Sequence, residues 1–140
     1  MIHKVIKYLF ICLLFCAPAS LFAQELSEEE MNREKKFRES IDKMVENYEN
    51  DLKLEDWQVF YVDSILTHDF TALTEELQQM NKAKVENPDL YQMSQDKWME
   101  QMYNAFRKVL DDKQWAKYLK NGASKDKKGR DKRAANRNSK

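Results

Sequence analysis

The chain has 140 residues, and its 24 Lys and Arg balance its 24 Asp and Glu, so the formal net charge is zero. Two glycines and two cysteines exclude a glycine-rich phosphate loop and a disulfide-dense scaffold. The charge is unevenly placed, with 14 basic and 22 acidic side chains in residues 24–120 but 8 and 2 in residues 121–140. This length allows one small domain, acidic in its body and basic at its end.

The first 23 residues have the pattern of a secretory signal peptide. Lys4 and Lys7 precede the apolar run YLFICLLFCA, and the small Ala23 marks the expected cleavage position. The run is shorter than the roughly 20 apolar residues that span a bilayer, so an uncleaved anchor is the less favoured alternative. Cleavage would remove both cysteines. We therefore expect an exported domain over residues 24–120, without disulfides and without stable membrane insertion.

The region from Ser27 to Lys120 is typical of helix, because it has one proline, no glycine and apolar residues about 3.6 positions apart. Ser27 with Glu30 predicts the start of a first helix, and Leu26 and Met31 would form a hydrophobic staple there. The expected apolar face of this helix comprises Phe37, Ile41, Met44, Val45 and Tyr48.

Three further helices follow. The second begins near Glu55 or Asp56 and runs to about Val85, with a wide apolar arc along it. Asn87 and Pro88 predict the start of the third, which runs to Leu110. The fourth is short, from Asp112 to Lys120, and Asn121-Gly122 would end it. The sequence therefore predicts an all-α, four-helix, hairpin-type domain, and a disordered basic tail at residues 121–140, which lack large apolar side chains.

One short pattern occurs twice, as LEDWQ at residues 54–58 and as LDDKQ at residues 110–114. In the second copy, Asp111 as N-cap and Gln114 three residues later predict a capping box. Glu55 is a weaker N-cap in the first copy, and Asp56 is an alternative that would shift the helix start by one residue. Both copies are explained as helix starts that need no ligand. The residues of the two motifs are Leu54, Glu55, Gln58, Leu110, Asp111 and Gln114.

The two copies resemble the LTxxQ motif, which occurs twice in the periplasmic Spy/CpxP family, and the chain is similar to a divergent member over residues 27–120. The family's Thr is replaced by Glu55 and by Asp111. The resemblance implies a periplasmic protein, coiled-coil-like helical hairpins, a curved antiparallel homodimer and a chaperone or stress-response role. Some relatives bind zinc through histidines, but His68 is the one histidine after the expected cleavage position.

The residue types argue against an enzyme. Without cysteine, and with a single histidine, the mature chain has neither a Cys/His nucleophile pair nor the usual zinc ligands, so no metal and no cofactor are expected. What the sequence offers is aromatic and methionine side chains in excess of what four slender helices can bury, a composition that suits adaptable binding surfaces. The candidate client-binding or partner-binding residues are Trp57, Tyr61, Ile65, Phe70, Trp98, Met102 and Trp115.

The leading hypothesis is an ATP-independent periplasmic chaperone that binds unfolded or partly folded envelope proteins. One alternative is a regulatory protein that docks on the sensor domain of an envelope-stress kinase. Another is a structural helical protein whose apolar faces are used in self-association. The basic tail could suggest nucleic-acid binding, but an exported, acidic body argues against it.

Overall fold

The computed structural model describes residues 27–139, so the expected signal peptide and Leu26 lie outside the described residues. The chain divides into two units, residues 1–34 and residues 35–140. In the first unit, the Ser27 Oγ accepts a hydrogen bond from the Glu30 N–H at 3.3 Å, and the Glu30 carboxylate accepts one from the Ser27 N–H at 3.0 Å. The helix start predicted at Ser27 is confirmed, and these two bonds form a capping box. It opens helix α2 (Glu28–Leu52), which continues into the second unit.

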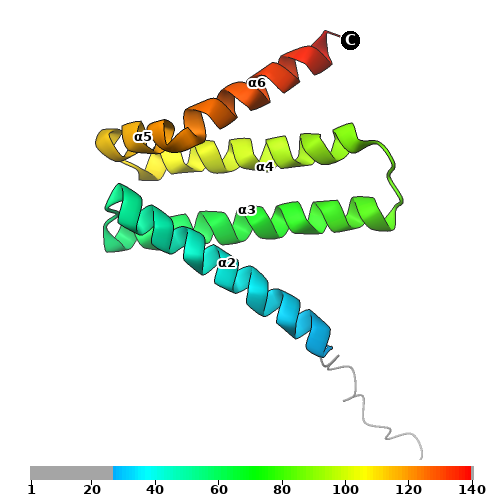
Figure 1. Cartoon of the computed structure of the whole chain (residues 1–140), viewed down its shortest axis with the longest axis horizontal. Helices are drawn as coiled ribbons and strands as arrows, with labels where there is room; N and C mark the ends of the chain where they lie inside the picture. The colour runs from blue at the N-terminus through cyan, green and yellow to red at the C-terminus, as the bar shows by residue number, and fades with distance from the viewer. Residues whose placement is uncertain (1–26, 140) are drawn as a thin grey trace, which may run out of the picture. The chain divides into compact units, whose positions relative to one another are not determined.

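In the second unit, the described helices are α2 from residue 35 onward, α3 (Asp56–Lys82), α4 (Pro88–Val109), α5 (Asp112–Tyr118) and α6 (Ser124–Asn138). Helices α3 and α4 run antiparallel side by side (Figure 1). The Asn87 Oδ1 accepts from the Asp89 N–H at 2.9 Å, and Pro88 occupies the first helical position, as predicted. The secondary structure of the described residues is all helical. No helix among them has the length and apolar character needed to cross a membrane.

The core lies where α2, α3 and α4 meet. Ile41, Val62, Leu66 and Phe106 are almost completely buried. Burying each of these side chains contributes about 1.5–3 kcal/mol relative to exposure. Around them pack Val45, Leu52, Met102 and Leu110, with partly buried side chains that include Phe37, Met44 and Tyr48. The apolar face expected for the first helix is therefore the face that the core uses.

The chain after α4 differs from the prediction. Helix α5 passes into a π-helical turn, Leu119–Ala123, in which Gly122 adopts φ 124°, and α6 then follows. Gly122 thus redirects the chain rather than ending the helical structure. The disordered tail expected over residues 121–140 is not confirmed, because residues 124–138 form α6. The physical reason is charge pairing. Basic side chains on one face of α6 bind carboxylates of α4, so a helix with no large apolar residue is still held.

Candidate functional site

The two repeated motifs come together in space. Gln58 lies in the first turn of α3 and Gln114 in the first turn of α5, and both are buried. The Gln58 Nε2 donates to the Gln114 Oε1 at 2.7 Å, and the Gln114 Nε2 donates to the Gln58 Oε1 at 2.9 Å. The sequence predicted two helix starts of the same type, but it did not predict that they bind each other.

Each glutamine also binds backbone groups at the two junctions. The Gln58 Nε2 donates to the Val109 carbonyl at 3.0 Å, and the Gln114 Nε2 donates to the Lys53 carbonyl at 3.3 Å. Lys53 and Val109 are the equivalent residues of the two copies, each directly before the motif leucine. Each amide therefore makes two donor contacts in a nearly symmetric arrangement, and the paired motifs act as a structural joint.

The local helix starts agree with most of the sequence reasoning. The Asp111 carboxylate accepts from the Gln114 N–H at 2.8 Å, and the Gln114 Oε1 accepts from the Asp111 N–H at 3.0 Å, so this capping box is confirmed. In the first copy Glu55 is the N-cap, with its N–H donating to the Gln58 Oε1 at 2.9 Å. The alternative start, with Asp56 as the cap, is wrong.

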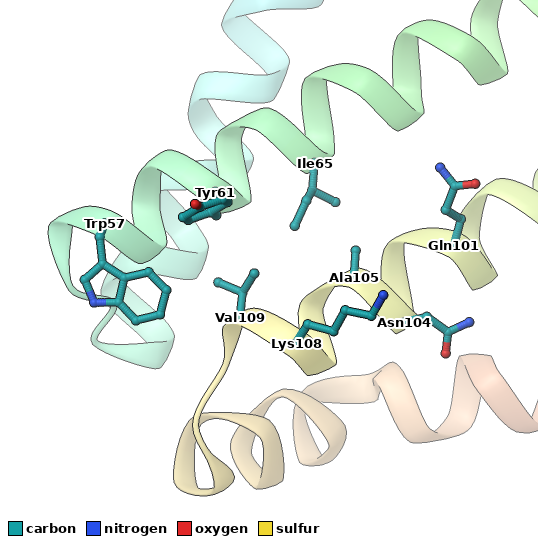
Figure 2. Close-up of a pocket in the computed structure, with 8 residues that line it drawn as sticks. All are labelled: Trp57, Tyr61, Ile65, Gln101, Asn104, Ala105, Lys108 and Val109. Atoms are coloured by element: carbon teal, nitrogen blue, oxygen red, sulfur yellow. The ribbon is translucent and has the colours of Figure 1, made fainter.

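An open groove of about 750 Å³ lies next to this joint, between the first half of α3 and the last half of α4. Figure 2 shows the side chains of α3 and α4 that face each other across it. From α3 come Trp57, Tyr61 and Ile65, three of the predicted binding residues. From α4 come Gln101, Asn104, Ala105, Lys108 and Val109. The groove thus has an aromatic wall and an opposite wall with amide groups and one ammonium group.

The aromatic wall is unusually exposed. Trp57 and Tyr61 each keep 51% of their surface accessible, and the neighbouring Phe60 keeps 68%. Both Trp57 and Phe60 pack edge-to-face on Tyr61, with ring centroids 6.1 and 5.7 Å away. The Trp57 Nε1 donates to the Glu55 carboxylate at 2.7 Å, which holds the indole in place. The three rings, here called the aromatic patch, form one surface in this structure.

Phe60 was missed because it lies outside the wide apolar arc expected for the second helix, and such a position is normally solvated. The only available signal was the crowding of three aromatic residues into the five-residue run WQVFY.

The other four predicted binding residues lie away from the groove. Phe70 and Met102 line a separate, partly open cavity, and Met102 keeps only 6% of its surface accessible. The Trp98 Nε1 donates to the Glu76 carboxylate at 2.7 Å on the α3–α4 hairpin. Trp115 packs on the rings of Tyr103 and Tyr118. Helical spacing identified them as apolar, but it did not distinguish interior contacts from the groove.

Polar contacts fix the two helices that form the groove. The Glu76 carboxylate of α3 accepts hydrogen bonds from Lys97 Nζ at 2.6 Å, from Ser94 Oγ at 2.6 Å and from Trp98. These donors on α4 lower the pKa of Glu76 to about 2. Nearer the groove, the Gln101 Nε2 donates to the buried Asp69 carboxylate at 2.8 Å.

The described residues contain no cluster of His, Cys, Asp and Glu that could hold a metal ion. What the site offers is non-covalent contact: exposed aromatic faces, an apolar floor and polar groups on one rim. Comparisons with protein-family models, with curated proteins and with solved structures found no match. The geometry of the groove is therefore the basis for a functional proposal.

Proposed function

We propose that the protein is an ATP-independent chaperone of the periplasm, a divergent relative of the Spy/CpxP proteins, and that it binds unfolded or partly folded envelope proteins. The observation that carries the proposal is the aromatic patch beside an open groove. Large aromatic side chains contribute most of the binding energy at protein interfaces, because they bury a large area at a small cost in conformational entropy.

The groove suits an extended segment with apolar side chains. Its volume of about 750 Å³ can hold a few side chains, and its open form does not require a single ligand shape. The Asn104 amide and the Lys108 ammonium line the same groove, and both can donate hydrogen bonds to the carbonyl groups of a peptide backbone. Apolar contacts in the groove, together with hydrogen bonds to the client's backbone at one rim, would give affinity with little sequence preference. Binding many different unfolded clients requires this property.

The proposal includes a homodimer, as the family resemblance implies. Sedimentation velocity of the wild type tests this part independently of any client. A monomer at all concentrations would remove the dimer from the proposal and leave the client-binding groove to its own test.

The direct test is light scattering of a chemically denatured client after dilution, with and without the protein, in buffer free of nucleotide. The wild type should suppress aggregation at about equimolar amounts. The triple variant Trp57→Ala, Phe60→Ala, Tyr61→Ala should need about tenfold more protein, since truncating an aromatic hot-spot residue costs more than about 1 kcal/mol.

A matched control is Leu90→Ala with Met93→Ala, which removes exposed apolar side chains of α4 outside the groove. This control should keep full activity. Absence of suppression by the wild type would refute the chaperone proposal. Equal losses in both variants would show that general hydrophobicity, and not the groove, is responsible.

A further inference from the structure

The amino-acid composition of α6 does not by itself explain why this segment is helical. The segment SKDKKGRDKRAANRN contains no apolar side chain larger than alanine, and Gly129 lies within it. An isolated helix of this length is marginal in water, and an interior glycine costs about 1 kcal/mol relative to alanine. The helical form of α6 therefore depends on what it contacts.

Its contacts with α4 are mainly ionic, and the Arg130 guanidinium also lies over the Tyr103 ring, with its Cζ 5.6 Å from the ring centroid. Arg133 binds the Asp96 carboxylate with two hydrogen bonds, Nη2–Oδ1 at 2.6 Å and Nε–Oδ2 at 3.0 Å. Arg137 reaches the same carboxylate at 3.3 Å. One turn further along α4, Glu100 binds Arg130 at 3.2 Å and Lys127 at 3.3 Å. Two carboxylates of α4 thus hold four cationic side chains of α6, a set we call the latch.

Beneath the start of α6 is a partly open cavity of about 190 Å³. The walls from α2, α3 and α4 are largely apolar and include Met44, Tyr48, Leu66, Phe70, Met99, Met102 and Tyr103. The wall from the π-helical turn and α6 is polar apart from one alanine: Asn121, Ala123, Asp126 and Arg130. Polar side chains in the cover do not match the methionine side chains of the opposite wall, although the Arg130 guanidinium lies favourably over the Tyr103 ring.

One atom of the cover shows the mismatch directly. Arg130 keeps only 9% of its surface accessible, and its Nη2 has no hydrogen-bond partner among the described residues. Leaving a buried donor unsatisfied costs about 1–3 kcal/mol. If α6 were released, water could hydrate the Arg130 Nη2. This hydration would offset part of the free energy lost with the ion pairs.

The connection to α6 allows such a movement. Gly122 adopts φ 124°, which side chains other than glycine rarely tolerate, and it separates α5 from α6. A single non-helical residue at this point gives α6 a hinge that leaves the core formed by α2, α3 and α4 intact.

We propose that α6 is an electrostatically latched cover, and that its release exposes the surface beneath it, centred on Met44, Phe70, Met99 and Met102, as a second binding surface for unfolded clients. The client part rests on the proposed function, whereas the latch does not. Adaptable methionine side chains suit varied apolar segments.

The first test is hydrogen exchange of the full chain by mass spectrometry, in NaCl from about 0.05 M to about 1 M, where the Debye length falls several-fold. Exchange protection of residues 124–138 should fall by about tenfold, because the ion pairs of the latch are partly exposed to solvent and salt weakens such pairs. Protection around Val62 and Leu66 should stay constant. If protection of α6 is independent of salt, the latch proposal is overturned.

The second test uses changes confined to α6, so the body still folds. Arg133→Glu with Arg137→Glu should release α6 at low salt and increase binding of a hydrophobic dye. The matched control, Lys128→Glu with Lys132→Glu, makes the same charge change at exposed positions of the same helix and should behave as the wild type. Release without increased dye binding would refute the exposed surface.

Client aggregation then separates the two proposals. The released variant should suppress aggregation at a lower ratio of protein to client than the wild type does. If α6 is released and dye binding rises, but neither protein suppresses aggregation, the chaperone function fails while the latch stands. If the wild type suppresses aggregation and the released variant is no better, the second client surface is refuted.

Discussion

Gln58 and Gln114 exchange two side-chain hydrogen bonds, of 2.7 and 2.9 Å, between positions 56 residues apart in the chain. Each amide also donates to the backbone carbonyl that precedes the other motif. The start of α3 and the start of α5 are therefore fixed relative to each other by one buried polar pair. Buried pairs with all partners present favour a single arrangement, because any alternative leaves polar groups unsatisfied.

Replacing either glutamine should destabilise the fold. Gln58→Ala leaves the Val109 carbonyl and the Glu55 N–H without their side-chain partner, and it removes one donor and one acceptor from Gln114. The expected loss is about 1–3 kcal/mol in the free energy of unfolding, measured by urea denaturation. Gln114→Ala should cost a similar amount, and the exposed Gln78→Ala less than about 0.5 kcal/mol.

The double variant Gln58→Ala, Gln114→Ala should cost little more than either single change, with a coupling energy of at least about 1 kcal/mol. Simple additivity of the two single losses would mean that the glutamines act independently, as two separate helix caps.

Two phenylalanines give a contrast between core and surface. Phe106 is completely buried, whereas Phe60 keeps 68% of its surface accessible. Phe106→Ala should lower the free energy of unfolding by about 3–5 kcal/mol through lost burial and the cavity left behind. Phe60→Ala should change it by less than about 0.5 kcal/mol. A large loss at Phe60 would mean that its ring supports the fold and is not free to bind a client.

The Glu76 cluster predicts a specific acid sensitivity. Hydrogen bonds from Lys97, Ser94 and Trp98 lower the pKa of Glu76 from 4.5 to about 2 in the folded protein. A carboxylate whose pKa is lower in the folded than in the unfolded protein stabilises the fold when it is ionised. For Glu76 this stabilisation is fully present above pH 4.5 and is lost as the pH falls from about 4.5 to about 2.

Glu76→Gln should therefore lower stability at neutral pH by about 1 kcal/mol, since Lys97 is partly exposed and the pair is screened by solvent. The difference between wild type and variant, from urea denaturation at a series of pH values, should shrink below pH 4.5. A difference that is constant across this range would show that the charge of Glu76 is not what binds α4.

The two glycines should respond to alanine with opposite signs. At Gly122 no atom lies within 4 Å of the position that a Cβ would take, but φ is 124°, so Gly122→Ala is opposed by backbone conformation alone. A loss of about 1–2 kcal/mol is expected. Gly129 lies within α6, where an added Cβ meets the Arg133 side chain at an ordinary 3.5 Å.

Gly129→Ala should therefore stabilise α6, slowing hydrogen exchange of residues 124–138 by about threefold to fivefold, since alanine is favoured over glycine in helices by up to about 1 kcal/mol. Faster exchange after this change would indicate that the glycine is needed for close contact with α4.

Local patterns were sufficient to predict most of the helices. Ser27, Asn87 and Asp111 mark helix starts through hydrogen bonds made within three residues, and such bonds depend only on the nearby sequence. The core face of α2 followed from 3.6-residue spacing for the same reason. Helix α6 was not predicted, because its stability comes from Asp96 and Glu100, which are about 30 to 40 residues away.

The candidate site was predicted only in part. Trp57, Tyr61 and Ile65 line one groove, because they share one stripe of one helix. The other four residues of the prediction do not line the groove: Phe70, Trp98, Met102 and Trp115. Which residues line it depends on which faces of α3, α4 and α5 meet. Phe60 was missed for a related reason. Helical periodicity identifies the residues of an apolar stripe, but it does not indicate the role of an aromatic side chain outside that stripe.

The sequence by itself determined the all-helical fold class of the described residues, the starts of α2 to α5 and the positions of the two glutamine motifs. These depend on hydrogen bonds and apolar spacing within a few residues. Only the tertiary structure decided that Gln58 binds Gln114, that the aromatic patch borders a groove and that α4 holds a basic helix. Those outcomes depend on which distant groups can satisfy a buried amide or pair with a carboxylate, and no local pattern contains that information.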